Sequence, residues 1–237
     1  DGSDNIGVGH NANFIVTGNN NSINMRNVFI GNSTSINRAN DVVLIGYNGT
    51  INNSADQSVG IGSEVKISGQ NSSGIGYDAD IAAVADSAVG IGNLVNLDGL
   101  QATALGAEAS VSGTNSTAIG YQSSVEANNE IYIGNSAMTS ISGTVNWTAT
   151  SDGRFKKDVQ ENVIGLDFIN RLRPVTYNYD AKKLHTQKGF DTKSLAAALS
   201  EKEQIRYSGF IAQEVEAAAK QLGYDFSGVD APQNEED

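Results

Sequence analysis

The chain has 237 residues, a net charge of −12, 26 glycines, no cysteine and only two histidines, His10 and His185. Without cysteine there is no disulfide or thiolate metal site, and two histidines so far apart argue against a histidine cluster, so we expect no metal or other cofactor. The acidic charge argues against a nucleic-acid partner, and no apolar run approaches the roughly 20 residues that a membrane span needs.

The composition changes near residue 150. Residues 1–150 hold three basic residues, twelve acidic residues and 20 of the glycines, whereas residues 151–237 hold twelve basic residues, fifteen acidic residues and both prolines. We therefore predict two domains, residues 1–145 and residues 146–237. The first residues lack the basic and apolar regions of a signal peptide, so we expect a soluble piece of a longer precursor.

A repeat of about fourteen residues runs through the first domain. An Ile-Gly or Leu-Gly pair recurs at spacings of 15, 16, 14, 16, 14, 14 and 14 residues. Its glycines are Gly31, Gly46, Gly62, Gly76, Gly92, Gly106, Gly120 and Gly134. A second apolar stretch, such as "SEVKIS" or "AEASVS", lies between copies. So short a unit is too small for a helix pair of ~34 residues and suits two strands joined by two turns.

Alternation within each copy predicts which side chains point inward. In "STAI", Ser116 and Ala118 face one side and Thr117 and Ile119 face the other. Small residues suit the inside of a narrow coil, so the larger aliphatic side chains need a further surface, naturally that of a neighbouring chain. Glycine after isoleucine allows the tight turn that closes each rung. A disordered linker is disfavoured, because linkers do not keep aliphatic residues in register over a hundred residues.

The copies "NSTAIG" and "DSAVGIG" resemble the head repeats of YadA-like trimeric autotransporter adhesins. The resemblance covers residues 5–135 and is strongest from Gly60 to Gly134. It implies a mostly β fold, a left-handed parallel β-roll (a solenoid) in which three chains pack side by side as a homotrimer. Some such heads bind host matrix proteins. A host-cell or matrix protein or a glycan is therefore a possible ligand, although no residue here can be matched to a ligand contact.

The start of the second domain, "SDGRFKKDV", resembles the start of the peptidase S74 domain. That domain is an intramolecular chaperone at the C-terminus of phage tailspikes, tail fibres and related surface proteins. The segments "GLDFINRLRPVTYNY" and "GFIAQEVEAAA" match in the same order. The family pattern Ser-Asp-x-Arg-x-Lys is met by Ser151, Asp152, Arg154 and Lys156.

The resemblance implies catalysis by Ser151 as nucleophile and Lys156 as base, with cleavage of the Thr150–Ser151 bond after trimerisation. A serine hydroxyl needs such a base, and positive charge from Arg154 and Lys157 favours a neutral lysine amine. In the alternative interpretation Ser151 is a turn or helix N-cap residue and the basic side chains are only solvated.

The chain departs from the family in two places. An insertion, "DAKKLHTQKGFDTKSLAAALSEKEQIRYS", separates the second and third motifs and predicts a short helix near residues 193–203. The family continues beyond this point into a long helix, so we expect a C-terminally truncated domain.

The remaining elements of the second domain follow from periodicity. "VTYNY" and "RYSGFIA" predict strands, and "QEVEAAAKQL" predicts a helix that ends at Gly223. Spacing predicts two buried helical stripes: Val163, Leu166, Ile169 and Leu172 in one helix, and Ala212, Val215, Ala219 and Leu222 in the other. Trp147 is interpreted as an anchor between the domains.

These features predict a structural and adhesive surface fibre, at a bacterial cell surface or in a phage tail, whose C-terminal chaperone drives trimerisation and folding. In the rival hypothesis the chain is chiefly a self-cleaving Ser-Lys protease and the repeat is a spacer. A solenoid that binds ice or glycan through a threonine face is disfavoured, because threonine does not recur at one position in the rungs.

Overall fold

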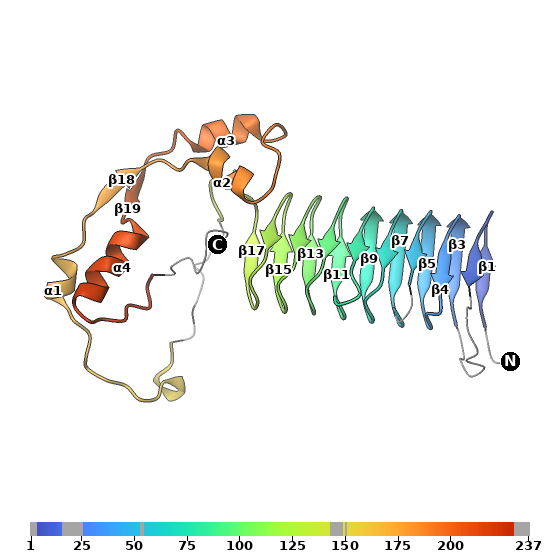
Figure 1. Cartoon of the computed structure of the whole chain (residues 1–237), viewed down its shortest axis with the longest axis horizontal. Coiled ribbons are helices and arrows are strands. Elements are labelled where there is room, and N and C mark those ends of the chain that lie inside the picture. Colours follow the sequence, from blue (N-terminus) through green and yellow to red (C-terminus); the bar gives the residue numbers. More distant parts are fainter. Residues whose placement is uncertain (1–3, 16–25, 53–54, 143–148, 150, 230–237) are drawn as a thin grey trace. The chain divides into compact units, whose positions relative to one another are not determined.

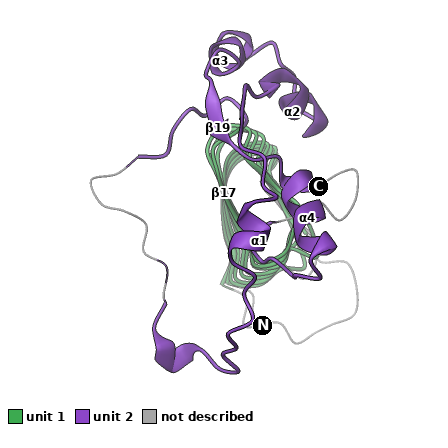
Figure 2. Ribbon diagram, turned by 90° about the vertical axis from the view of Figure 1, so that its left-hand side faces the viewer, with its two compact units in different colours: residues 1–135 green, residues 136–237 purple. Residues whose placement is uncertain are grey.

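The structure is a computed structural model that describes residues 4–15, 26–52, 55–142, 149 and 151–229. It divides into two compact units, unit 1 of residues 1–135 and unit 2 of residues 136–237 (Figure 2). Trp147 and Thr150 lie outside the described residues.

Unit 1 is a β-solenoid whose short strands stack as successive rungs (Figure 1), so the predicted fold class is confirmed. One sheet has nine parallel strands: β1 (Ile6–Val8), β3 (Val28–Asn32), β5 (Val43–Tyr47), β7 (Val59–Ser63), β9 (Ser73–Tyr77), β11 (Val89–Ile91), β13 (Thr103–Leu105), β15 (Thr117–Ile119) and β17 (Ile131–Ile133). The other has eight: β2 (Asn13–Ile15), β4 (Ser35–Asn37), β6 (Thr50–Ile51), β8 (Lys66–Ile67), β10 (Asp80–Ile81), β12 (Asn96–Leu97), β14 (Ser110–Val111) and β16 (Ser124–Val125).

The repeated glycines form one column through the nine-stranded sheet. Gly46 pairs with Gly31 and Gly62, and all three have a positive φ, between 138° and 150°. A Cβ on Gly62 would lie 1.7 Å from the carbonyl oxygen of Gly76 on the next rung. Glycine is therefore needed mainly for close stacking of rungs, and the turn that we assigned to it is made further along, for example at Glu64 with φ 62°.

The inside of the solenoid combines small and large side chains from opposite sheets. Ser116 and Ala118 are buried, Thr117 is half-buried and Ile119 is exposed, which confirms the predicted alternation. The expectation that small residues fill the coil is incomplete, because the eight-stranded sheet contributes large aliphatic side chains. These fully buried residues are Ile36, Ile51, Ile67, Ile81, Leu97 and Val111. Each contributes about 1.5–3 kcal/mol to the free energy of unfolding.

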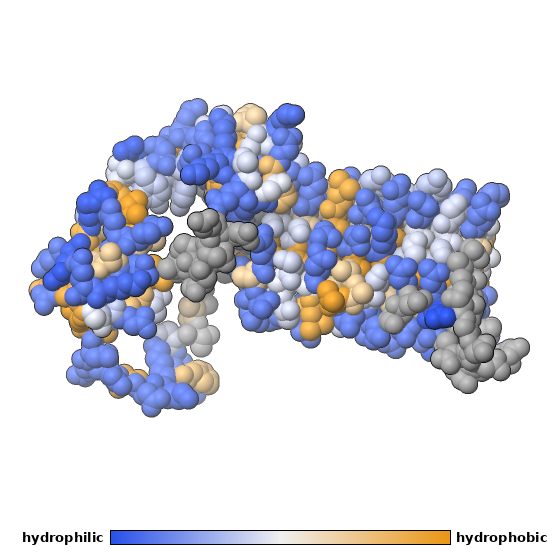
Figure 3. Space-filling model, in the orientation of Figure 1, coloured by the Kyte–Doolittle hydropathy of each residue, from blue (hydrophilic) through white to orange (hydrophobic). Residues whose placement is uncertain are grey.

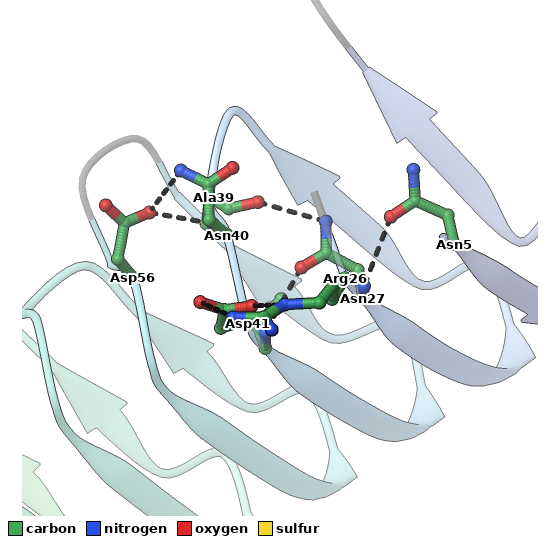
Figure 4. A network of polar contacts seen from close by, with 8 residues as sticks. Asn5, Arg26, Asn27, Ala39, Asn40, Asp41 and Asp56 are labelled. Carbon is green, nitrogen blue, oxygen red and sulfur yellow. Dashed lines mark hydrogen bonds and ion pairs between the residues drawn. The ribbon is translucent and has the colours of Figure 1, made fainter. Parts of the chain in front are cut away.

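Buried polar side chains link successive rungs and satisfy backbone groups that the strands leave free. The Ser72 hydroxyl donates to the carbonyl oxygen of Ala85 (3.0 Å) and accepts from the backbone N–H of Ala88 (3.1 Å). Nearer the N-terminus, the Asn27 amide donates to the carbonyl oxygen of Ala39, and Asp56 accepts from the backbone N–H of Asn40 (Figure 4). These bonds remove the penalty of burying unpaired polar groups.

Unit 2 contains a two-stranded antiparallel sheet and helices. Its elements are the 3-10 turn η1 (Gly153–Phe155), α1 (Leu166–Ile169), β18 (Val175–Tyr177), α2 (Ala181–Gln187), α3 (Ala196–Lys202), β19 (Tyr207–Gly209) and α4 (Ala212–Gln221). The predicted strands, the helix near residues 193–203 and the helix that ends at Gly223 are confirmed. Helix α2, inside the insertion, was not predicted.

The first predicted stripe of unit 2 is wrong for three of its four members, whereas Leu172 packs against the buried cluster as expected. Helix α1 is a single turn between Gly165 and Asn170, and Val163, Leu166 and Ile169 are all more than half exposed. The buried side chain is Phe168, whose ring packs on Tyr224 at 5.5 Å and on Phe226 at 5.0 Å. An aromatic ring buries more area than a leucine, so Phe168 determines the buried face.

The second stripe is largely confirmed. Val215 and Ala219 are buried and Leu222 packs against them. Ala212 is exposed and Ala218 is buried in its place, because Ala212 is the first residue of α4.

Candidate functional site

The outer face of the nine-stranded sheet carries a continuous aliphatic column. Successive members are paired in register, so neighbours lie about one strand spacing apart, near 4.8 Å. The members are Ile30, Ile45, Ile61, Ile75, Ile91, Leu105, Ile119 and Ile133. Ile61 is 38% exposed and Ile91 is 41% exposed. Figure 3 shows hydrophobic surface on the rungs in one view of the molecule.

The outer face of the eight-stranded sheet is polar instead. The first residues of strands β4 to β16 in this sheet are paired in register and are all polar: Ser35, Thr50, Lys66, Asp80, Asn96, Ser110 and Ser124. A sheet with one apolar outer face packs that face on something, whereas a polar face is stable in water. The solenoid therefore has one aliphatic outer face and one polar outer face.

The structure brings together the two residues predicted to be catalytic. The Lys156 ammonium donates to the Ser151 hydroxyl oxygen at 2.9 Å, and both residues are exposed. The turn η1 between them places the lysine side chain back over the serine. Its N-cap is Asp152 and not Ser151, so the interpretation of Ser151 as the cap is wrong.

Asp152 also forms an ion pair with Arg154. The carboxylate accepts from the Arg154 backbone N–H at 2.8 Å and from its guanidinium Nη2 at 2.7 Å. This pairing lowers the pKa of Asp152 and raises that of Arg154. Arg154 therefore stabilises the turn that carries the pair, and its charge is directed at Asp152 and not at Lys156.

The surroundings of the Ser151–Lys156 pair are open within one chain. Every described residue from 153 to 163 is exposed, including Phe155 at 77% and Val159 at 78%. A lysine acts as a base when burial or nearby positive charge disfavours its ammonium form. One chain positions the two groups and leaves apolar side chains beside them that another chain could cover.

Two contacts in unit 2 were missed by sequence reasoning. Arg173 forms a bidentate ion pair with Glu214, which joins the second and third motifs and lowers the pKa of Glu214. His185 is buried against Ser136, 49 residues away. Opposite charges within two matched motifs could have suggested the first contact, whereas no local pattern signals the second.

Neither a metal centre nor a membrane helix is found in the part of the chain that the structure describes. Asp78 and Asp80 offer carboxylate oxygens of the kind that calcium binds, but both face Lys66, whose ammonium lies 2.9 Å from Asp78 and 3.9 Å from Asp80. Burial raises the pKa of Asp80, which disfavours the anion that calcium needs.

Comparison with known families supports both domains in the predicted order. Residues 98–123 match two copies of the YadA head domain repeat, and residues 151–224 match Peptidase_S74, the chaperone of endosialidase. The solenoid extends this repeat well beyond the matched residues, from β1 to β17. No curated protein matches the chain. Both families are those of surface or phage fibre proteins, and the chain joins a segment similar to the head repeat to a segment similar to the chaperone domain.

Proposed function

We propose that the chain is a homotrimeric, extracellular fibre module in which unit 2 starts the assembly of unit 1. The observation that carries the proposal is the aliphatic column. Three parallel solenoids that turn this column toward a common axis bury it, and they leave the polar sheet in solvent. A ligand such as a host-cell or matrix protein or a glycan would then meet the polar faces.

Burying the column offsets a large part of the free-energy cost of assembly. Ile61 and Ile91 keep more than a third of their surface exposed, and covering it contributes about 1–2 kcal/mol per side chain. Six of the eight positions are exposed to this extent, and together they give roughly 10 kcal/mol per chain, comparable to the loss of rotational and translational freedom on association. Burial of the column therefore favours the assembled state, but it does not speed the first encounter between separate chains.

Unit 2 supplies what the solenoid lacks. Three identical rungs can pair in many shifted registers, because each rung resembles the next. Holding three chains together at one end raises the effective concentration of partner strands and fixes one register. Large exposed apolar side chains in unit 2, among them Phe155, Val159 and Leu166, suit this role as contacts between chains.

The column can be tested with matched substitutions to aspartate. Ile61→Asp or Ile91→Asp places a charge in the proposed interface, whereas Ser110→Asp places the same residue on the polar sheet. We expect the first two variants to elute as monomers or aggregates and the third to keep the parent mass by light scattering. Equal masses for all four proteins would contradict the proposed interface.

A second candidate function, autoproteolysis before Ser151, is favoured by the 2.9 Å contact between Lys156 and Ser151. In the proposed step the neutral Lys156 amine takes the hydroxyl proton as the Ser151 oxygen attacks the Thr150 carbonyl carbon. An ester forms, the C–N bond breaks, and the proton passes to the new amino group of Ser151. Water then hydrolyses the ester, which leaves a carboxyl group on Thr150 and restores the hydroxyl group.

Denaturing gels distinguish this activity from a chaperone role alone. The parent protein should give two bands, and N-terminal sequencing of the C-terminal fragment should begin at Ser151. Ser151→Ala and Lys156→Ala should each give a single band. Lys183→Ala, at an exposed lysine of α2 outside the motif, is the control and should behave as the parent does. One band in the parent would leave the chaperone role and remove the protease role.

A further inference from the structure

The insertion of unit 2 carries a buried histidine that contacts the first residue of the unit. The Nδ1 atom of His185 lies 2.7 Å from the Oγ atom of Ser136, and the two residues are 1% and 3% exposed. The other ring nitrogen, Nε2, is buried and has no hydrogen-bond partner among the described residues. Ser136 is therefore the polar anchor of this ring.

The surrounding helices hold His185 in place. His185 follows the buried Ala181 by one turn on α2, and its ring stacks on Phe190 at 5.5 Å. Helix α3, with the fully buried Leu199, packs against α2. The insertion thus forms a small core of its own, and His185 connects this core to Ser136.

The contact spans the proposed cleavage position. Ser136 lies 15 residues before Ser151, and His185 lies 34 residues after it. After cleavage of the Thr150–Ser151 bond, Ser136 would remain with the repeats while His185 would belong to the chaperone fragment. No covalent bond would then join the two residues, and the buried hydrogen bond would become a contact between two polypeptides.

We propose that the His185–Ser136 contact is a retention clasp, which keeps the chaperone domain attached to the repeats after the chain is cut. The clasp rests on the proposed autoproteolysis for its biological use, but its contact exists in the intact chain. In a trimer three clasps would act together, so the domain would leave only when all three open. With this contact from the insertion, the chaperone domain would stay bound to the repeats after cleavage and would not be released.

A cut that does not depend on Ser151 tests the clasp directly. A recognition sequence for a specific endoprotease is inserted between Thr144 and Val145 of the full chain, and the purified protein is cleaved. Denaturing gels confirm the cut, and size-exclusion chromatography after dilution gives the rate at which the two fragments separate. The parent fragments should elute together.

Two variants and one control assign retention to the contact. His185→Ala removes the ring, and Ser136→Ala removes only the hydroxyl and leaves the buried imidazole unpaired. Each should speed separation by roughly 10- to 100-fold, the effect of losing one buried hydrogen bond. Lys183→Ala, on the exposed side of α2, should separate at the parent rate. Far-UV circular dichroism before cleavage checks that each variant is folded.

Several results would overturn the clasp. Parent fragments that separate as fast as those of His185→Ala would do so, as would parent-like retention in both variants. Fast separation in His185→Ala with parent-like retention in Ser136→Ala would also contradict it, because the histidine would then act only through packing. Failure of the proposed function is seen separately: a single band without added protease counts against autoproteolysis and leaves the clasp test intact.

Discussion

Unit 1 and unit 2 build their small hydrophobic cores in opposite ways. Unit 1 repeats one rung, so each buried residue has a counterpart about fourteen residues away, and its aliphatic column is exposed along one face. Unit 2 repeats nothing: it buries single aromatic side chains such as Phe168 and leaves Val163 and Leu166 exposed. The difference shows that repetition gives a long shaft its stability, whereas an irregular unit can carry contacts that occur once.

The largest expected effect on stability comes from a substitution that disrupts the column of stacked glycines in unit 1. Gly62→Ala places a Cβ 1.7 Å from a backbone oxygen of the next rung at a φ of 138°, and should lower the free energy of unfolding by at least about 3 kcal/mol. Gly153→Ala in unit 2, with open space around the new Cβ, should change it by less than about 0.5 kcal/mol. Equal thermal midpoints for the two variants would contradict the stacking role of the column.

The next effect removes one large side chain from the solenoid interior. Ile67→Ala should lower the free energy of unfolding by about 2–5 kcal/mol, because the rigid rungs above and below cannot collapse into the cavity. Val84→Ala, outside the aliphatic column, removes methyl groups from a side chain that is 68% exposed and should have little effect on stability. Denaturant titration gives both values, and a smaller loss for Ile67→Ala than for Val84→Ala would count against the interior assignment.

The smallest effect concerns the exposed ion pair of unit 2. Arg173 lowers the pKa of Glu214 in the folded state, so this pair stabilises unit 2 above the ordinary glutamate pKa, and the stabilisation is lost as pH falls through the lowered pKa. Glu214→Gln should therefore lower the thermal midpoint slightly at neutral pH and remove part of its fall in acid.

The matched control for this pair is Asp167→Asn, at an exposed carboxylate of the same unit. Its acid dependence should follow that of the parent. A midpoint that falls equally with pH in the parent and in Glu214→Gln would show that the ion pair has no part in the acid sensitivity.

The fold of unit 1 could be predicted well from the sequence because the same pattern of residues recurs in every rung. Ile119, alone, could face either side of a strand, but eight in-register copies of its position established which side is outward. The large interior residues of the second sheet, such as Ile67, were placed less well, because the shorter strands between copies alternate over only two residues.

In unit 2 the sequence predicted elements better than contacts. A three-residue spacing suggested a stripe through Leu166, yet Phe168 packs with Tyr224 and Phe226, which lie more than 50 residues away. The Ser151–Lys156 contact followed from a local motif, whereas the Ser136–His185 contact depends on how an insertion folds back. Long-range contacts that occur once leave no periodic signal in a single sequence.

The central claim, that the aliphatic column is covered by sister chains, is tested most directly by the mass of the intact chain in solution. Sedimentation equilibrium at micromolar concentration should give three times the 24.8 kDa of one chain. A single, well-folded 24.8 kDa species under the same conditions would contradict the account.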